Sequence, residues 1–501
     1  MVIQHIHWSY TLYSTVILLA DLIIRIGLSI RIIMRKRPYG VSLAWLIVIL
    51  LVPFLGGFFY LLFGENRLPE KRMARAKASY KMYISWLQGL GSRLPLSWEE
   101  NNPAYGSLHR QAKKLVGLPA MAGNKLTLIS SPEEIIGSIT KAINNAQSTC
   151  HLQFYIWENG GRVDAVIAAL HRAVNRGIIC RILVDSIGSR DFLNSITAKD
   201  MKKAGIKIQE SLPAGIISAL FSRIDIRNHR KIVVIDGTIA YTGSQNMVDP
   251  DVFKKSAGVG NWIDTMVKVE GPVVETLAGT FLSDWYLETS VGYFGSDSLE
   301  EDITQIRDFS DLQSCPAVGY SDVQLVPSGP GGVPDAIHSL LLTTIYAARR
   351  ELIMTTPYFI PDEPLLLALK SAAQRGVDVK IIVPEKNDSL LVQYASRARY
   401  EELAESGVRI FLFSGGLLHS KTITVDQSFS LFGSVNLDMR SFWLNFEATM
   451  LIYCKSFTKT LLQTQKEYLS NSTELDFLVF RHRSHFEKFK ENLILLIAPI
   501  L

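Results

Sequence analysis

The stretch HRKIVVIDGTIAYTGSQN at residues 229–246 recurs in altered form as HSKTITVDQSFSLFGSVN at residues 419–436. Both copies read His-x-Lys-x4-Asp-x6-Gly-Ser-x-Asn with identical spacing. Six fixed letters at about 5% usage each give on the order of 10⁻⁸ per starting position, so two chance copies can be dismissed. The pair predicts a duplicated structural unit.

Alternating strand and helix patterns precede each copy in the same order. The patterned segments are the strand His151–Trp157, the helix Asp164–Arg176 and the strand Cys180–Asp185, followed later by a strand from Glu351, the helix Glu363–Arg375 and the strand Val379–Pro384. Both helices end in an Arg-Gly step, where Gly177 and Gly376 can adopt a left-handed cap. The pattern predicts two tandem α/β repeats that share one active site at a pseudo-two-fold axis.

The rest of the chain divides by composition. We predict a membrane anchor hairpin at 1–66, a basic helical connector at 67–124, a first α/β domain at 125–290, an acidic linker at 291–319, a second α/β domain at 320–476 and an amphipathic tail at 477–501. The tail fits either an interfacial segment or an ordinary packed helix.

The N-terminal region is strongly apolar and predicts a transmembrane helical hairpin with spans at about 10–30 and 41–63. The first span contains Asp21 and Arg25, whose i, i+4 spacing lets them neutralise each other on a helix. The second is uncharged and long enough to cross a hydrocarbon layer of about 30 Å, although Pro53 leaves a kink or a re-entrant hairpin open. Basic clusters follow both spans, and the larger one favours a cytoplasmic catalytic region.

Composition excludes several classes. Hydrophobic residues make up 48% and charged residues 20% of the 501 residues, so the chain is not disordered. The net charge of +5 is too small for a dedicated duplex-DNA binder and suits a surface that meets anionic lipid or phosphate esters. The four cysteines lie far apart and indicate neither a disulfide framework nor a zinc site.

The repeated motif carries the chemistry of phosphoryl transfer. In an extended strand, His229 and Lys231 project from the same face, as do His419 and Lys421. An imidazole can act as nucleophile or as general acid and base, and a lysine can neutralise phosphate oxygens. Two facing copies would place one histidine on each side of a phosphodiester, so neither metal nor cofactor is required.

Other motif residues have supporting roles in this interpretation. Each histidine needs its second ring nitrogen held, and we expect Asp264 to hold the histidine of the first copy and Glu447 that of the second. The predicted phosphate donors are the amides and hydroxyls of Asn246, Asn436, Ser244 and Ser434. Asp236 and Asp426 complete the catalytic motif, although turn or hydrogen-bonding roles suit them equally well.

The paired HxKxxxxD motifs resemble those of the phospholipase D superfamily. The chain is similar, essentially from end to end, to the long, membrane-anchored bacterial cardiolipin synthases. The stretches that carry this likeness are PFLGGFFYLLFGENRL, FYIW, RNHRKIVVIDGTIAYTGSQNMVDP, GVGNWID, MTTPYFIP, PEKNDSLLVQYASRARY, GGLLHSKTITVD and GSVNLDMRSFWLNFE. Only the acidic linker and the last thirty or so residues diverge.

The resemblance implies transphosphatidylation between two phosphatidylglycerol molecules, giving cardiolipin and glycerol through a phosphatidyl-histidine. By analogy His229 is the nucleophile and His419 the acid and then the base, but the symmetry of the repeats makes this assignment reversible. The implied partners are phosphatidylglycerol and an anionic bilayer, without nucleic acid, in a bacterial plasma membrane. The sequence does not indicate an oligomeric state.

Three other readings compete with this one. A membrane phospholipase D or phosphodiesterase would use the same histidines with water as acceptor, so only its products distinguish it. A lipid-binding scaffold without activity would have lost a His or Lys from one motif, and none is lost. A nuclease would need a more basic groove and no apolar 41–63 segment.

Overall fold

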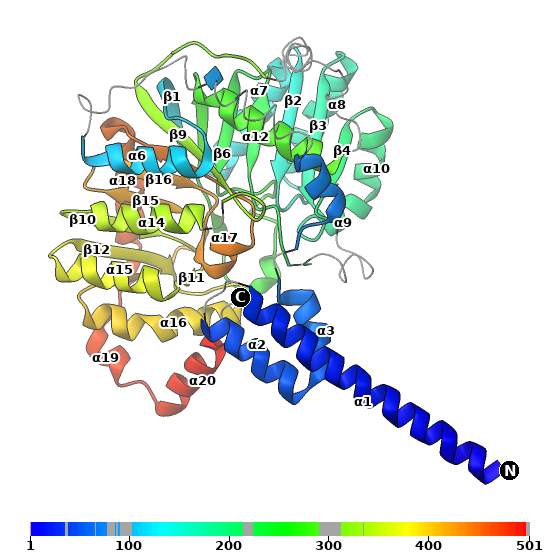
Figure 1. Ribbon diagram of the computed structural model, residues 1–501. Coiled ribbons are helices and arrows are strands. Elements are labelled where there is room, and N and C mark those ends of the chain that lie inside the picture. Colours follow the sequence, from blue (N-terminus) through cyan, green and yellow to red (C-terminus); the bar gives the residue numbers. More distant parts are fainter. Residues whose placement is uncertain are drawn as a thin grey trace. The chain divides into compact units, whose positions relative to one another are not determined.

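The computed structural model describes residues 2–35, 39–65, 67–77, 86, 89–90, 103–213, 223, 225–289, 312–333 and 335–496. The chain forms two compact units, one made of Met1–Glu70 with Ala214–Ile226 and the other of Lys71–Pro213 with Arg227–Leu501. Figure 1 shows the chain coloured along its sequence. Most of the predicted acidic linker lies outside the described residues.

In the described part of the first unit lie the helices α1 (Val2–Met34), α2 (Tyr39–Leu51) and α3 (Pro53–Phe63). The segment 41–63, for which the sequence left a kink or a re-entrant hairpin at Pro53 open, is therefore divided between two helices. Val52 is non-helical and Pro53 opens α3, because a proline disfavours helical geometry in the residue before it and fits the first helical position. The 13 residues of α2 rise about 20 Å at 1.5 Å each. Among the described residues, no helix combines the length and apolar character of a membrane span.

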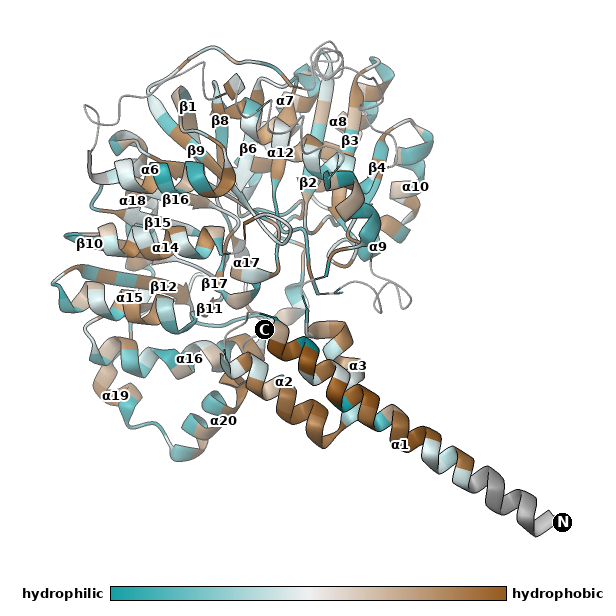
Figure 2. Ribbon diagram, in the orientation of Figure 1, coloured by the Kyte–Doolittle hydropathy of each residue, from teal (hydrophilic) through white to brown (hydrophobic). Residues whose placement is uncertain are grey.

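A buried carboxylate joins the ends of α1 and α3. Glu65 is 2% exposed and receives two hydrogen bonds from Arg31, at 2.7 and 2.8 Å. The Tyr60 hydroxyl donates to the same carboxylate at 2.9 Å. Because a buried carboxylate must be paired, this cluster fixes α1 against α3. Large apolar side chains remain exposed along α1 and α2, which are mostly brown in Figure 2.

The second unit is built on a mixed sheet of 15 strands among the described residues. The strands of its first half are β1 (Met121–Ile129), β2 (Thr149–Phe154), β3 (Ile179–Asp185), β4 (Lys207–Ser211), β5 (Ile232–Ile235), β6 (Ile239–Gly243) and β8 (Met266–Glu270). The second half has β9 (Ser321–Ser328), β10 (Glu351–Thr355), β12 (Asp378–Pro384), β13 (Arg409–Phe413), β15 (Thr422–Val425), β16 (Phe429–Gly433), β18 (Glu447–Ile452) and β19 (Ser472–Glu474).

The strand order confirms the predicted duplication. Read outward from the antiparallel β1–β9 pair, the first half runs β1-β8-β6-β5-β2-β3-β4 and the second β9-β18-β16-β15-β10-β12-β13, with β19 added at the edge. In the first half β2, β3 and β4 are parallel to one another, and in the second half β10, β12 and β13 are. The other neighbouring strands of the sheet pair antiparallel. The two α/β repeats therefore form one continuous sheet with matching topology.

Helices cover both faces of this sheet (Figure 1). In the first repeat these are α7 (Pro132–Asn145), α8 (Val163–Asn175), α9 (Arg190–Asn194), α10 (Ile196–Lys203) and α12 (Val273–Glu288), and α6 (Pro103–Val116) precedes β1. The second repeat has α14 (Ala336–Ala347), α15 (Glu363–Gln374), α16 (Leu390–Glu405), α17 (Met439–Trp443) and α18 (Lys455–Ser470), followed by α19 (Phe477–Arg481) and α20 (His485–Leu495). Alternate residues of β5 show the layering: Val233 packs with α7 and α8, while Val234 packs with α12.

The predicted helix ends are confirmed, but one predicted strand begins later. Gly177 and Gly376 have φ of 85° and 86°, as the left-handed caps require. The strand expected from His229 begins only at Ile232. Residues before it pair with the other repeat instead, because the His229 N–H donates to the carbonyl of Phe446 at 2.9 Å.

Candidate active site

The two motif histidines lie where the segments leading into β5 and β15 cross to the opposite repeat. Next to His229, Asn228 forms a bridge with Phe446. Next to His419, β14 (Leu417–Leu418) pairs in parallel with β7 (Trp262–Ile263). The His419 N–H donates to the carbonyl of Ile263 at 2.8 Å. Each histidine is thus fixed by backbone of the repeat to which it does not belong.

This crossing decides which carboxylate holds which histidine. His229 Nδ1 lies 2.9 Å from both carboxylate oxygens of Glu447, and His419 Nδ1 lies 2.7 Å from Asp264 Oδ1. The predicted pairing within each copy was wrong. The reason is that Glu447 follows Phe446 and Asp264 follows Ile263, the two residues whose carbonyls receive the histidine N–H groups.

Both histidines and both carboxylates are buried, and their pKa values are shifted as a result. Burial lowers the pKa of His229 and of His419 to about 4, although the facing carboxylates oppose the shift. Burial alone would raise the pKa of Asp264 and Glu447, but the charges of the facing histidine and lysine lower it below the usual range. At neutral pH both imidazoles are therefore neutral, with Nδ1–H donated to a carboxylate and Nε2 left for a reactant.

The lysines complete the site from the same segments, just before β5 and β15 begin. Lys231 Nζ donates to the carbonyl of His229 at 2.7 Å, and Lys421 Nζ donates to the carbonyl of His419. Each lysine charge also acts on the histidine of the other repeat, lowering its pKa. The two motifs therefore lie close enough to form one electrostatic site.

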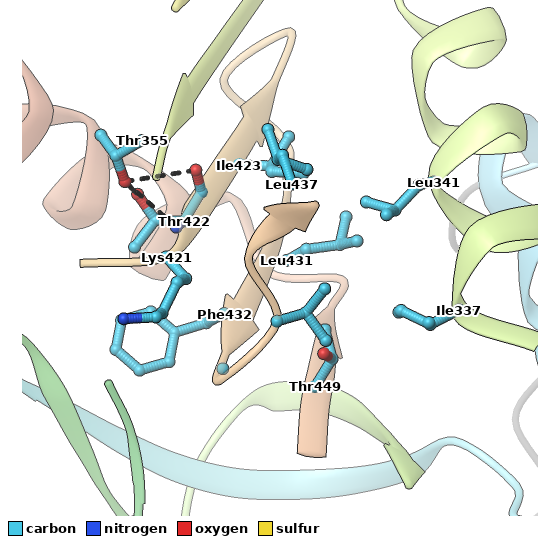
Figure 3. Close-up of a pocket in the computed structure, with 12 residues that line it drawn as sticks. Ile337, Leu341, Thr355, Lys421, Thr422, Ile423, Leu431, Phe432, Leu437 and Thr449 are labelled. Atoms are coloured by element: carbon cyan, nitrogen blue, oxygen red, sulfur yellow. Dashed lines mark hydrogen bonds between the residues drawn. The ribbon is translucent and has the colours of Figure 1, made fainter. Parts of the chain in front are cut away.

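The lysines are held in surroundings that disfavour their charge. Burial lowers the pKa of Lys421 to about 7 against the opposing effects of Asp264 and Glu447, and it lowers the pKa of Lys231 well below its usual value. Figure 3 shows a cavity beside Lys421 whose wall includes Ile337, Leu341 and Phe432. A negative phosphodiester bound beside Lys421 would favour the charged form of this lysine.

The serine hydroxyls are already engaged. Ser434 Oγ donates to Glu447 Oε2 at 2.5 Å and accepts from the N–H of Ala448 at 3.0 Å. Ser244 Oγ bonds to both backbone groups of Thr265, at 3.0 and 3.2 Å. Because a hydroxyl has one proton to donate, Ser244 and Ser434 could donate to a phosphate oxygen only by giving up these bonds. They fix the strands that carry the two carboxylates.

The two asparagines remain suited to a ligand. Asn246 Oδ1 accepts from the N–H of Ile156 at 3.1 Å, so its NH2 group is the end left for another acceptor. Asn436 is 4% exposed, and its Oδ1 has no hydrogen-bond partner among the described residues. Because Oδ1 accepts, it could meet a donor such as a lipid hydroxyl, whereas only the NH2 group of Asn436 could donate to a phosphate oxygen.

The aspartates of the motif lie at the far ends of their strands. Asp236 accepts backbone N–H bonds from Gln147, Ser148 and Thr149, at 2.7 to 3.1 Å. Asp426 accepts the equivalent bonds from residues 349–351, at 2.7 to 2.9 Å. The structure does not bring them to the histidines, and these contacts are the hydrogen-bonding role that the sequence allowed for Asp236 and Asp426 beside a catalytic one. They join the end of a helix to the start of β2 or β10.

Other groups near the histidines were not found from the sequence. The Tyr155 ring lies 5.1 Å from the His229 ring, and the Trp262 ring lies 4.4 Å from that of His419. Arg230, inside the first motif, donates to the Glu447 carbonyl at 3.0 Å and to Asp284 at 2.7 Å. The second motif has Ser420 at that place, so the repeat gave no signal for Arg230.

A buried arginine from the connector reaches the same carboxylate. Arg72 is 3% exposed, lies 3.7 Å from Asp284 and pairs with Glu288. Its guanidinium also lies 4.7 Å from the centre of the Phe446 ring. The backbone that carries Glu447 is thus supported by a network of buried charges. Among the described residues, no cluster of three or more His, Cys, Asp or Glu side chains is arranged for a metal ion.

Comparison with known proteins agrees with this geometry. Residues 139–285 and 341–469 match the family described as "Cardiolipin synthase, PLD-like domain", and residues 23–65 match "Phospholipase_D-nuclease N-terminal". The cardiolipin synthase A proteins of Klebsiella pneumoniae subsp. pneumoniae and Escherichia fergusonii are each 40% identical over 492 residues, which is 98% of this chain and 99% of theirs. The chain belongs to the cardiolipin synthase family. Both copies of the motif lie inside the matched domains of that family.

A solved structure shares the fold at low sequence identity. The phosphatidylserine synthase of Haemophilus influenzae Rd KW20 superposes with a TM-score of 0.58 at 16% identity. The match covers 79% of this chain and all of that one. At this identity the likeness shows the arrangement of the two repeats and nothing about the substrate.

Proposed function

We propose that this protein is a cardiolipin synthase that transfers a phosphatidyl group from one phosphatidylglycerol to another, releasing glycerol. The observation that carries the proposal is the pair of buried histidines, each held at Nδ1 by a carboxylate of the opposite repeat. Membership of the cardiolipin synthase family supports the choice of substrate. The reaction exchanges one phosphodiester for another, so it needs no external energy source.

In the first step, His229 Nε2 attacks the phosphorus of one phosphatidylglycerol. A P–N bond forms and the bond from phosphorus to the glycerol oxygen breaks, while His419 gives a proton to that oxygen. His419 must carry this proton although burial lowers its pKa, and the negative phosphodiester favours the charged form. Lys231, Lys421 and the two asparagine amides hold the phosphate oxygens.

In the second step, a hydroxyl of another phosphatidylglycerol attacks the phosphatidyl-histidine. His419 takes the hydroxyl proton, the new P–O bond forms and the P–N bond breaks, which restores both imidazoles. The lipid alcohol must react ahead of water, and the burial of both histidines and both lysines supports that preference. The assignment of nucleophile and acid is part of the proposal.

We also infer that the unit of α1, α2 and α3 attaches the protein to a bacterial plasma membrane. Exposed apolar residues along α1, among them Leu12, Leu18 and Ile23, support this inference. The interruption at Pro53 favours a short, bent segment over a straight second span. The larger basic cluster after this segment supports a cytoplasmic catalytic unit.

Product analysis tests the function. Purified full-length protein is incubated in detergent with labelled phosphatidylglycerol and EDTA, and cardiolipin, phosphatidic acid and glycerol are followed. We expect cardiolipin and glycerol in equal amounts, lost in both His229→Ala and His419→Ala. His171→Ala, which changes a histidine on α8, is the matched control and should remain active. Phosphatidic acid without cardiolipin would assign the protein to the hydrolases.

A further inference from the structure

The C-terminal helix α20 packs with a charged side facing inward and an apolar side facing outward. Its most buried side chain is a carboxylate, Glu491, at 0% exposure, whereas Phe486, Phe489, Leu493 and Leu496 are 52 to 77% exposed. The spacing of these four apolar residues, i, i+3, i+7 and i+10, places them along one side of the helix. An ordinary surface helix shows the opposite arrangement.

Ion pairs hold the inner side of α20 against α16. Glu491 receives hydrogen bonds from Arg397 at 2.8 Å and Arg483 at 2.7 Å. Glu401 pairs with Arg483 at 2.6 Å and with Lys488 at 3.1 Å. The helix is therefore fixed by specific contacts that leave its apolar side facing outward. We call that side, with Phe486, Phe489, Leu493 and Leu496, the outer stripe.

The outer stripe lies at an edge that leads to the active site. Next to it on α20, Ile494 and Leu495 pack with Ile360, Val392 and Tyr358. Tyr358 donates to Asp388 at 2.9 Å, and Asp388 in turn favours the charged form of Lys421. At the same end, α16 begins with Leu390 and Leu391, which are 69% and 44% exposed. The apolar surface thus continues along the edge of the catalytic unit.

We propose that the outer stripe inserts into the surface of an anionic bilayer beside the active site. Residues 481–491 carry four basic side chains, Arg481, Arg483, Lys488 and Lys490, against the two carboxylates Glu487 and Glu491, and this positive excess suits anionic headgroups. The stripe runs along a helix of 11 residues that is about 16 Å long and about 10 Å wide. Such a strip covers about 160 Å², well below the roughly 800 Å² per partner of a stable protein interface. That size fits shallow insertion at the depth of the headgroups.

A site-specific fluorophore tests the contact in the full-length protein. An NBD label at Phe489→Cys in vesicles of phosphatidylcholine and phosphatidylglycerol should shift to the blue and be quenched by nitroxide lipids. A label at Ile196→Cys, on α10 at a position 77% exposed, is the control and should do neither. The described cysteines are buried, so the unsubstituted protein gives the background. Quenching should fall at least twofold in pure phosphatidylcholine.

Activity gives a second, separate readout. The variant Phe486→Ser/Phe489→Ser/Leu493→Ser should raise the apparent KM for phosphatidylglycerol in vesicles at least fivefold. Turnover of water-soluble dihexanoyl phosphatidylglycerol should stay within twofold, which shows that the site is intact. Leu367→Ser, at an exposed position on α15, is the matched control for both substrates.

Several results would overturn the proposal. One is a label at residue 489 that remains as exposed to water as the label at residue 196. Another is a shift that follows protein concentration instead of lipid, since it would assign the stripe to a second copy of the chain. Equal losses with the vesicle and soluble substrates would also contradict it. The labelling result does not depend on which acceptor the enzyme uses, so it stands apart from the proposed reaction.

Discussion

His229 Nδ1 lies 2.9 Å from the carboxylate of Glu447, although 218 positions separate the two residues in the chain. The equivalent bond joins His419 to Asp264 across 155 positions in the opposite sense. Neither repeat can therefore orient its own histidine. The active site is complete only when both repeats are folded and joined, which gives a physical reason for the two motifs to occur in one chain.

Replacing each carboxylate should impair the step that uses the histidine it holds. Glu447→Gln should slow formation of the phosphatidyl-histidine about 10²- to 10⁴-fold, because the amide no longer favours the Nδ1–H tautomer of His229. Asp264→Asn should act through His419 on proton transfer in both steps. Rapid-quench measurement of the covalent intermediate checks this. An Asp264→Asn variant whose only defect is a loss of His229 nucleophilicity would contradict the crossed pairing.

Replacing the motif aspartates should affect stability more than catalysis. Asp236→Ala removes an acceptor for three backbone N–H groups and should lower the free energy of unfolding by about 1–3 kcal/mol. Asp236→Asn should cost less, because asparagine keeps an acceptor and tolerates the φ of 53° at this position. Thermal unfolding and kcat at a permissive temperature are the measurements. A loss of kcat above 100-fold in a folded Asp236→Asn protein would restore a catalytic role.

Anion binding should weaken as pH rises above 7. Burial lowers the pKa of Lys421 to about 7, and the charged lysine is the form that binds an anion. Above pH 7 sulfate must therefore bind together with a proton, and its Kd should rise about tenfold per pH unit if one proton is taken up. Sulfate is chosen because its own charge is constant from pH 6 to 9.

Isothermal titration calorimetry at several pH values measures this dependence. Lys421→Met should bind sulfate more weakly and with a flatter dependence on pH. Lys380→Met is a control, since Lys380 pairs with Glu351 at the other end of the second repeat's strands. An affinity that is constant between pH 7 and 9 in the unsubstituted protein would contradict the prediction.

Removing Asp284 should be more damaging than removing a surface carboxylate. Asp284 lies between the guanidinium groups of Arg230 and Arg72, and all three are at most 7% exposed. Asp284→Ala leaves two buried cations without this partner, so we expect a loss of about 3–5 kcal/mol. Melting temperature and kcat are the checks, with Asp200→Ala at an exposed ion pair on α10 as the control. Equal stability of both variants would show that the buried network is unimportant.

Local rules account for what could be predicted from the sequence. The alternation of β2, α8 and β3 follows from apolar periodicity, and the left-handed caps at Gly177 and Gly376 follow from the missing Cβ. The duplicated motif was enough to predict two repeats and their histidines and lysines. Pro53 predicts an interruption of the 41–63 segment, but a proline alone does not tell whether a helix bends or ends.

Tertiary structure decided the features that depend on pairing across the repeats. The sequence places Asp264 and Glu447 at equivalent points of the two repeats. The backbone bonds from His229 to Phe446 and from His419 to Ile263 are what bring Glu447 to His229 and Asp264 to His419. The same is true of Ser434, whose hydroxyl is engaged by Glu447 and not left for phosphate. Periodicity acts over a few residues, whereas these contacts join strands from separate repeats. The sequence by itself therefore determined which histidines and lysines form the candidate site, and the fold determined their partners.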